Sequence, residues 1–386
     1  MNLSIELTVK GSSLSVAKPP IIFSFFSGSG FLDLGFEMSG FDVRFVNEFH
    51  EPFLNAYKYS RKQMNLAEPK YGHFLGSIED FVTGERATEL SGFVNNAKSE
   101  SLVGFIGGPP CPDFSVAGKN KGSEGENGKL SRVYIDAIIK NKPDFFLFEN
   151  VKGLWRTVKH RAFYEEMKER LEMAGYVLTD RLTNCIEYGV PQDRDRILLF
   201  GILKSRAGII QSSTLEEKFD WQSKVKFDRN KVLDKKIWPS QEEYAQDSVK
   251  VCPKTLEQYR ELTVEHWFIE NNVYEHPNAS HHFKPQALHR FQTVLEGDDS
   301  KKSFKRLHRW RYSPTAAYGN NEVHLHPYKD RRLSAAESLA IQSLPKEFCL
   351  PPTMTLSDMF KTIGNGVPFI ASKKIAETIN TYLDTL

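Results

Sequence analysis

Short apolar runs alternate with amphipathic segments through the first half of the chain, and this alternation restricts the fold more than any other feature of the sequence. After the first run, Gly28 and Gly30 turn the chain and apolar residues at helical spacing follow, as they do again before Gly175. The pattern predicts an α/β fold with a mostly parallel, doubly wound sheet that helices cover on both faces. We expect strands at residues 21–26, 43–49, 102–106, 144–148 and 196–203.

The alternation fails between about residues 205 and 330, where the chain is polar, rich in tryptophan and without repeats. Apolar patterning returns at Ser334, which forms a capping-box start for a helix with Glu337, and a last helical segment is expected over 369–383. The expected domains are a first one of residues 1–205, completed by 360–386, and a smaller irregular recognition domain of residues 206–359.

The composition restricts the class of protein. A chain of 386 residues that is 40% hydrophobic can bury one large core and a second smaller one. No apolar stretch approaches the roughly 18 residues of a membrane helix, and the N-terminus lacks the layout of a signal peptide, so we expect a soluble, cytoplasmic protein. The four cysteines contain no C-x-x-C pair, which indicates neither a disulfide framework nor a cysteine zinc site. No metal is expected.

Positive charge is concentrated in residues 301–311, although the net charge of the whole chain is only +2. The segment contains no acidic residue, and Phe304 and Trp310 stand among its cations. This mixture is typical of surfaces that contact phosphates and bases, while a solvated basic helix face is the alternative. The six cations are Lys301, Lys302, Lys305, Arg306, Arg309 and Arg311.

Four informative segments follow expected strands. They are residues 27–30, Glu48, residues 107–111 and Glu149. Because ligands of parallel sheets collect at the carboxyl ends of the strands, these segments should line one crevice.

Cys111 stands among prolines at 109, 110 and 112, which restrict the backbone and direct its side chain. A thiol is a nucleophile only as the thiolate, which Asp113 would oppose if it pointed inward. The alternative is a small buried residue. Glu149 ends an almost wholly apolar strand, where partial desolvation suits a carboxyl group to donate a proton, unless it only forms a salt bridge.

The first turn has features of an adenosine site. Gly28 and Gly30 allow close approach of a ligand, and Glu48 follows at nearly the offset of an acid that binds ribose hydroxyls. Asp33 replaces the last glycine of a dinucleotide fingerprint, which disfavours NAD or FAD, and a simple tight turn is the alternative.

Two arginines begin the strand expected at 196–203. In a strand, Arg194 and Arg196 would point to the same face, where they either bind a carbonyl or phosphate oxygen or pair with Asp193 and Asp195. Spacing alone does not separate these possibilities.

Taken together, these motifs resemble the cytosine-5 DNA methyltransferases, which use S-adenosylmethionine. The resemblance covers residues 21 to about 201 and 331–368, with the blocks in the family's order. They are Phe-Ser-Gly-Ser-Gly at 26–30, Asn-Glu at 47–48, Pro-Pro-Cys at 109–111, Glu-Asn-Val at 149–151, Gln-Asp-Arg-Asp-Arg at 192–196, residues 331–345 and Gly-Asn-Gly-Val at 364–367.

The resemblance implies a sheet of the S-adenosylmethionine-dependent methyltransferase type with a target-recognition domain. Cys111 would add to carbon 6 of a flipped cytosine while Glu149 engages ring nitrogen 3, and Arg196, with Arg194 nearby, would hold the base oxygen. The glycine-rich segment after Cys111 would close over the DNA. Double-stranded DNA would be the substrate of a monomeric modification enzyme from a restriction-modification system.

The resemblance also implies binding residues. Ser77 stands where the family often has an aspartate that reads the adenine amino group, and Pro112 and Asp113 replace the commoner residues after the cysteine. Ser115 and the six cations of 301–311 would contact DNA. The residues expected around S-adenosylmethionine are Phe26, Ser27, Gly28, Gly30, Phe31, Glu48, Phe49, Ser77, Ile78, Pro110, Leu130, Asn365 and Val367.

Three other functions remain to be compared with this one. A tRNA cytosine-5 methyltransferase of the same fold is the nearest, although the long region from about 205 to 330 favours duplex DNA. Asp33 and the Pro-Pro-Cys motif disfavour a nicotinamide oxidoreductase. The presence of Cys111, Glu149 and Arg196 together disfavours a non-catalytic DNA-binding relative.

Overall fold

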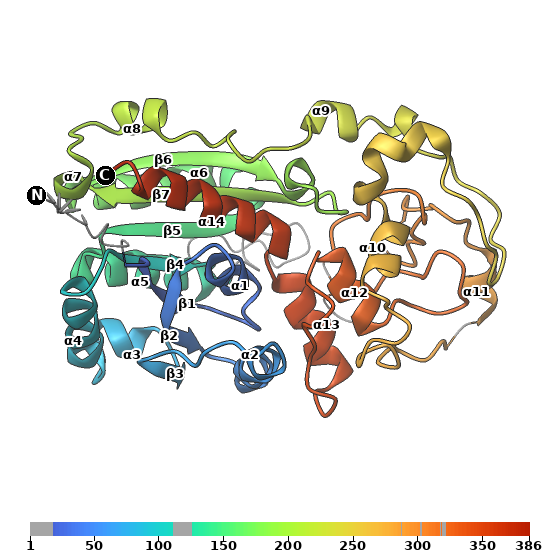
Figure 1. The fold of residues 1–386 in the computed structure, drawn as a ribbon, viewed down its shortest axis with the longest axis horizontal. Coiled ribbons are helices and arrows are strands. Elements are labelled where there is room, and N and C mark those ends of the chain that lie inside the picture. The colour runs from blue at the N-terminus through green and yellow to red at the C-terminus, as the bar shows by residue number, and fades with distance from the viewer. Residues whose placement is uncertain (1–17, 111–125, 287, 302, 317, 319–321) are drawn as a thin grey trace, which may run out of the picture.

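The chain forms two lobes, one built on a single sheet and one of short helices and loops, with helices α12 and α13 between them (Figure 1). The computed structural model describes residues 18–386 except 111–125, 287, 302, 317 and 319–321. Among the described residues, no helix is long and apolar enough to cross a membrane.

The first lobe contains a seven-stranded sheet in the order β3-β2-β1-β4-β5-β7-β6. The pairs from β3 to β5 are parallel, and β7 runs antiparallel to both of its neighbours, so the prediction of a mostly parallel sheet is confirmed. Strands β3 and β6 were not predicted from the sequence. The strands are β1 Ile21–Phe25, β2 Asp42–Glu48, β3 Gly72–Leu75, β4 Val103–Gly107, β5 Phe145–Val151, β6 Tyr176–Asn184 and β7 Asp195–Leu203.

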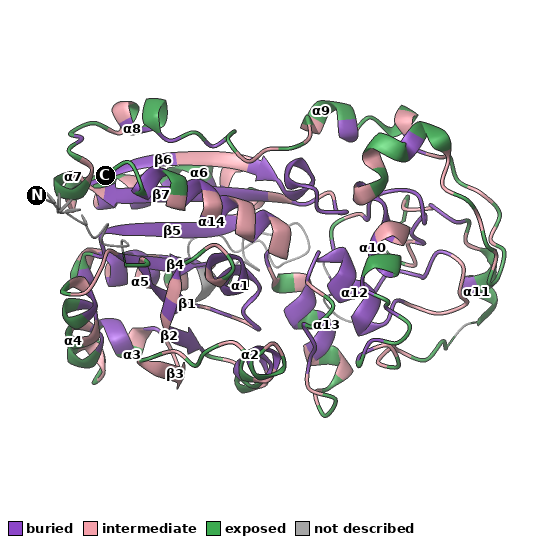
Figure 2. Cartoon of the chain, in the orientation of Figure 1, coloured by how far each residue is buried: buried purple, intermediate pink, exposed green. Residues whose placement is uncertain are grey.

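Helices cover both faces of the sheet because the strands are apolar on both sides (Figure 2). Alternate residues of β1 show this, since Ile22 packs in the core with α1 and α14, whereas Ile21 and Phe23 pack in the core with α4, α5 and α6. The last helix, α14, therefore packs against the first lobe. The helices are α1 Phe31–Glu37, α2 Glu51–Gln63, α3 Glu79–Val82, α4 Ala87–Lys98, α5 Glu126–Asn141, α6 Val158–Met173 and α14 Phe369–Leu383.

The second lobe is irregular, as its sequence predicts, and is held by two smaller hydrophobic clusters. Ser334 and Glu337 form the expected capping box at the start of α12. The helical elements of this part of the chain are α7 Lys204–Ala207, α8 Ser212–Lys218, α9 Arg229–Val232, η4 Lys235–Ile237, η5 Lys254–Leu262, α10 Val264–Glu270, α11 Leu288–Thr293, α12 Ala335–Ile341 and α13 Leu356–Asn365.

The hydrophobic cores do not divide at the expected domain boundaries. Leu215, Phe219 and Trp221 lie beyond residue 205 but pack in the core of the first lobe. Phe360 and Ile363 of α13 pack instead with α10 and α12. The chain thus leaves the first lobe after about residue 221 and returns to it with α14.

Candidate active site

The carboxyl ends of β1, β2, β4 and β5 lie side by side at one edge of the sheet because these strands are parallel neighbours. Residues 27–30 follow β1, Glu48 ends β2, Gly108 follows β4 and Glu149 lies near the end of β5. The expected convergence is therefore confirmed for the described residues of these segments. Cys111 itself lies outside the described residues, which end at an exposed Pro110 before the gap.

Glu149 is held in place from two sides. Its side chain is buried, and Oε1 lies 2.6 Å from Nε of Arg196 on the adjacent strand β7. A Cβ atom added to Gly108 would fall 2.5 Å from Oε2 of Glu149, so only glycine fits against the carboxyl group there. Because Gly108 directly precedes Pro109, this contact brings the start of the Pro-Pro-Cys motif beside Glu149.

The two arginines of the Gln-Asp-Arg-Asp-Arg segment have different surroundings. Strand β7 begins at Asp195, so Arg194 directly precedes it and Arg196 is its second residue. Arg194 is buried and donates hydrogen bonds to the carbonyl oxygens of Ala316, Gly364 and Gly366. Burial, with Arg196 nearby, lowers the pKa of Arg194 to about 9. Arg196 therefore lies at the site, and Arg194 connects it to the second lobe and to α13.

Asp193 and Asp195 do not take these arginines as ion-pair partners. Asn184 donates hydrogen bonds to both carboxylates, at 2.7 Å and 3.0 Å. Lys152 and Arg229 form ion pairs with Asp195, at 2.8 Å and 2.7 Å. The pairing that spacing left open is thus between Arg196 and Glu149.

The first turn places a carboxylate and an aromatic ring at the end of β2. Glu48 is buried, and its two oxygens accept hydrogen bonds from the backbone N–H groups of Gly28 and His50, each at 2.8 Å. Burial raises the pKa of Glu48. Phe49, next to it, has 75% of its surface exposed, which is unusual for an aromatic side chain.

These residues fit a nucleoside. The buried Ser27 hydroxyl has no hydrogen-bond partner among the described residues, and backbone donors hold Glu48 at the same turn. Gly28 adopts a positive φ of 56°, a conformation that favours glycine. Because glycine has no side chain, the backbone of this turn is open to a ligand. A free hydroxyl, a fixed carboxylate and an exposed ring are the groups that ribose hydroxyls and adenine require.

The other predicted cofactor residues differ in their exposure to solvent. Phe26 and Leu130 are half-buried, Asn365 is exposed, and Ile78 and Val367 are buried.

Two of the predicted cofactor residues have side chains that contact other parts of the protein. Ser77 accepts a hydrogen bond from the backbone N–H of Glu79, at 3.2 Å. Phe31 packs edge to face against Phe348 with 5.2 Å between ring centroids, and a Cβ atom on Gly366 would meet its ring. Its side chain therefore belongs to the hydrophobic core between the lobes.

A buried polar cluster under the first turn was missed in the sequence. Arg61 of α2 donates a 2.7 Å hydrogen bond to the Gly30 carbonyl, pairs with Glu37 at 2.9 Å and stacks on Tyr57. Burial raises the pKa of Asp33, on the neighbouring helix α1, to about 7. The i, i+4 spacing of Tyr57 and Arg61 was visible, but nothing in the sequence shows that their shared face meets the glycine turn.

The prediction that residues 301–311 form a phosphate-binding surface is wrong for Arg306 and Arg309. Both are buried. Arg306 donates to the carbonyl oxygens of Val294 and Lys329 at 2.9 Å and 3.1 Å, and burial lowers its pKa to about 10. Arg309 pairs at 2.8 Å with Glu296, which is itself fully buried. These guanidinium groups hold the second lobe together and are not available to DNA.

The other cations of residues 301–311 differ in their exposure and in their partners. Arg311 donates to the Gly297 carbonyl and lies 3.5 Å from Asp299, whereas Lys301 is exposed and Lys305 half-buried. The described part of the segment contains no helix, so the alternative of a basic helix face is wrong as well. Lys302 and Ser115 lie outside the described residues.

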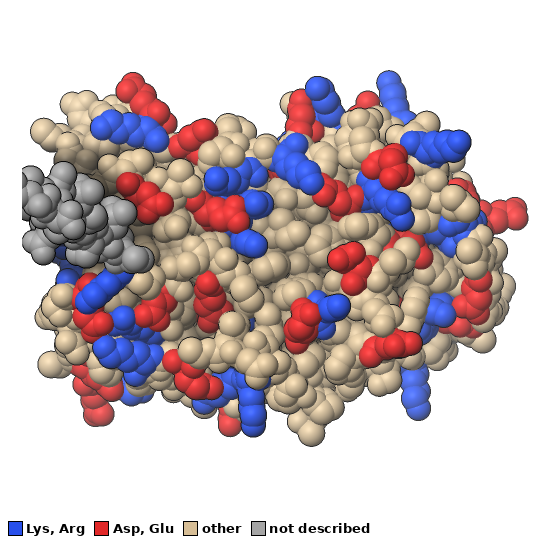
Figure 3. Space-filling model, viewed as in Figure 1, with Lys and Arg blue, Asp and Glu red and all other residues tan. Residues whose placement is uncertain are grey.

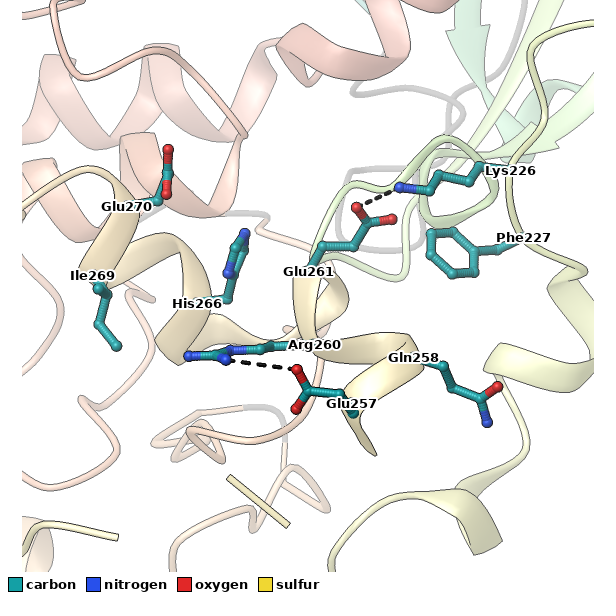
Figure 4. Close-up of a pocket in the computed structure, with 9 residues that line it drawn as sticks. All are labelled: Lys226, Phe227, Glu257, Gln258, Arg260, Glu261, His266, Ile269 and Glu270. Atoms are coloured by element: carbon teal, nitrogen blue, oxygen red, sulfur yellow. Dashed lines mark hydrogen bonds and ion pairs between the residues drawn. The ribbon is translucent and has the colours of Figure 1, made fainter. Parts of the chain in front are cut away.

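A hollow of about 500 Å³ lies away from this edge, between η5, α10 and the chain at 226–227 (Figure 4). Its wall carries both charges, with Lys226 paired to Glu261 at 2.5 Å and Arg260 lying 3.8 Å from Glu257. None of the predicted site residues lines it. On the face of the molecule seen in Figure 3, cations and anions are likewise interspersed.

Comparison with known proteins agrees with the geometry. The family described as C-5 cytosine-specific DNA methylase matches residues 21–381. The chain is 59% identical over 390 residues to the Type II methyltransferase M.NmeDI of Neisseria meningitidis serogroup C, an alignment covering 99% of this chain and 90% of that protein. The Type II methyltransferase M.FnuDI of Fusobacterium nucleatum is 28% identical over 383 residues, covering 93% of this chain and 94% of that protein.

A solved structure shows the same fold. It is described as a DNA modification methyltransferase encoded within an E. coli prophage, and it superimposes with a TM-score of 0.65 at 21% identity, covering 95% of this chain and 99% of that one. Since the family match spans the whole sheet and both segments that meet at Glu149, this chain belongs to the C-5 cytosine-specific DNA methylase family.

Proposed function

We propose that this protein transfers a methyl group from S-adenosylmethionine to carbon 5 of a cytosine in duplex DNA, through a covalent bond to Cys111. One observation carries the proposal. The Glu149 carboxyl group lies at the carboxyl edge of the sheet, is fixed by Arg196 and packs against Gly108, three residues before Cys111. A nucleophile and an acid thus come from adjacent strand ends.

Carbon 5 of cytosine is too weak a nucleophile to take a methyl group unaided. In the proposed mechanism the Cys111 thiolate adds to carbon 6, and Glu149, engaging ring nitrogen 3, directs the electron pair to carbon 5. S-adenosylmethionine, when bound, supplies the methyl group as a sulfonium. After transfer, loss of the carbon 5 proton to a base restores the ring double bond and expels the Cys111 thiolate.

The other three cysteines are poorly suited to this step. Cys185 is 1% exposed, and burial raises its pKa to about 12. Burial also raises the pKa values of Cys252 and Cys349. A nucleophilic cysteine needs the thiolate and access to its substrate. Cys111 is the remaining cysteine, and it follows the strand that ends beside Glu149.

The proposal also covers how the cofactor and the target base are bound. Glu48 binds the ribose hydroxyls and Phe26 and Phe49 flank the adenine, with the unpartnered Ser27 hydroxyl beside them. Carbon 6 of a stacked cytosine is shielded within a duplex, so the base must turn out of the helix to reach Cys111. The lobe that follows the sheet would hold the duplex during this step.

Duplex DNA that contains 5-fluorocytosine tests the mechanism, because fluorine cannot leave carbon 5 as a proton does and the adduct persists. With S-adenosylmethionine, the wild-type protein should give a DNA adduct that survives denaturing electrophoresis. Cys111→Ser should give none, whereas the controls Cys185→Ser and Cys252→Ser should still form it. An adduct that is lost with Cys185→Ser and kept with Cys111→Ser would refute the assignment.

We also propose that the protein is the modification enzyme of a restriction-modification system, as the Type II methyltransferase names of its relatives suggest. Bisulfite sequencing of DNA from an expressing host should then find methylated cytosines within one recurrent short sequence. Methyl transfer to duplex DNA and to tRNA, measured side by side, separates this function from the tRNA alternative. Transfer to tRNA alone would contradict the proposal.

A further inference from the structure

A second basic segment follows the active-site strand directly. Residues 150–164 contain Lys152, Arg156, Lys159 and Arg161 and no acidic residue. All four cations are exposed. We call these four residues the basic rim. It begins three residues after Glu149, so it lies at the edge of the sheet where the cytosine must bind.

The backbone of the basic rim is well supported. A short 3-10 helix, η2 Lys152–Trp155, follows β5, and the Thr157 side chain then caps α6 by accepting from the backbone N–H of His160. The His160 ring lies 3.1 Å from the Gly153 carbonyl and joins the two turns. Helix α6, which lies behind β6 and β7 in Figure 1, is anchored through buried Phe163 and Met167.

Among the described residues, no acid forms an ion pair with Arg156 or Arg161 of the basic rim. Asp195 pairs with Lys152, but it is shared with Arg229, so one carboxylate faces two cations. The next acids along α6 are Glu165 and Glu166, and Glu166 already pairs with Arg132. The guanidinium groups of Arg156 and Arg161 are therefore exposed without an acidic partner, and that of Arg161 lies 5.5 Å from the centroid of the half-buried Trp155 ring.

We infer that the basic rim binds the phosphate backbone of duplex DNA beside the target cytosine. The inference rests on the proposed function, which requires a duplex at this edge of the sheet. Exposed lysine and arginine side chains on a fixed backbone suit phosphate oxygens, whose contacts set the position of a protein on DNA without reading sequence. The buried arginines of 301–311 cannot supply these contacts.

The salt dependence of DNA binding tests the inference. Each lost phosphate contact lowers the slope of log affinity against log salt concentration by about 0.9. The double variant Arg156→Gln/Arg161→Gln should therefore reduce the slope by about two for a short fluorescent duplex of arbitrary sequence. Between about 50 and 200 mM salt, the wild type should then lose roughly tenfold more affinity than the variant does.

The matched control is Lys204→Gln/Lys218→Gln, which removes the same charge from α7 and α8. It should keep the wild-type slope. A slope of the rim variant equal to that of the control would overturn the inference, even if methylation is intact. A wild-type protein without affinity for the duplex at low salt would instead contradict the proposed function, so the two failures are distinguishable. Circular dichroism verifies that both variants are folded.

Discussion

Two arginine- and lysine-rich segments of this protein have opposite environments. Residues 301–311 contain six cations, yet Arg306 and Arg309 are buried and bonded to the second lobe. Residues 150–164 contain four, and all of them are exposed. The more basic segment is therefore the less available to a ligand. Positive charge in a sequence predicts a nucleic-acid surface only when the fold leaves that charge in solvent.

The architecture of each lobe explains the difference. Around the basic rim, strand β5 and helix α6 satisfy most backbone groups, so its lysine and arginine side chains are not needed as donors and remain exposed. The second lobe has loops in place of a sheet, and their buried carbonyl groups need other donors. Arg306 supplies three N–H positions to such carbonyls, including those of Phe291 and His326. Arginine suits this task because its guanidinium carries five donors.

The two basic segments should differ most in how much a substitution lowers the free energy of unfolding. Arg309→Ala leaves the fully buried Glu296 without its main partner, and breaking a buried ion pair costs about 3–5 kcal/mol. Arg156→Gln on the basic rim should change the free energy of unfolding by less than about 0.5 kcal/mol. Urea denaturation of both variants measures this. Equal losses would remove the distinction between the segments.

Arg61 offers a buried arginine within the first lobe. Arg61→Met removes the donor to the Gly30 carbonyl and should lower stability by roughly 2–3 kcal/mol. Because that carbonyl belongs to the turn that we propose binds S-adenosylmethionine, the KM for this cofactor should also rise about tenfold, which is equivalent to about 1.4 kcal/mol. This rise should exceed the fall in kcat.

Steady-state kinetics should show partial recovery of KM with Arg61→Lys, since an ammonium group can also donate to the carbonyl. Lys62→Met, at the exposed neighbouring position, serves as the control and should leave KM at the wild-type value. A KM for Arg61→Met that matches this control would show that Arg61 supports only the fold.

The pH dependence of stability should give the smallest effect. Burial by itself would raise the pKa of Glu296, but hydrogen bonds from Arg309 and the charges of Arg309 and His308 lower it below its ordinary value. A carboxyl group with a lowered folded-state pKa stabilises the protein above its unfolded pKa, and this stability is lost as the pH falls through the folded value.

Glu296→Gln should therefore flatten the loss of stability below about pH 4.5, the ordinary pKa of a glutamate. Thermal unfolding at a series of acidic pH values measures the slope. The rim variant Arg156→Gln should follow the wild-type curve. A wild-type slope in Glu296→Gln would show that this buried pair does not contribute to acid sensitivity.

The sequence predicted most of the sheet and its catalytic edge, but it missed two strands. Strand β3 has only four residues and they are half-buried or exposed, so no apolar run marks it. Strand β6 begins directly after the glycine that ends α6, and its Thr179, Asp180 and Arg181 interrupt the apolar pattern. Local patterning detects strands that are buried on both faces and overlooks those at the edges of the sheet.

The amino-acid sequence by itself determined which chemically informative residues the chain carries and where they stand relative to the strands. The glycine turn, Glu48, the Pro-Pro-Cys segment and Glu149 each follow an apolar run, and parallel pairing brings such positions together. Only the tertiary structure decided which partner each polar group has. Arg196 pairs with Glu149, Arg194 donates to distant carbonyl groups, and Arg309 pairs with Glu296. A local sequence pattern cannot predict these pairs, because each joins separate segments that only the folded chain brings together.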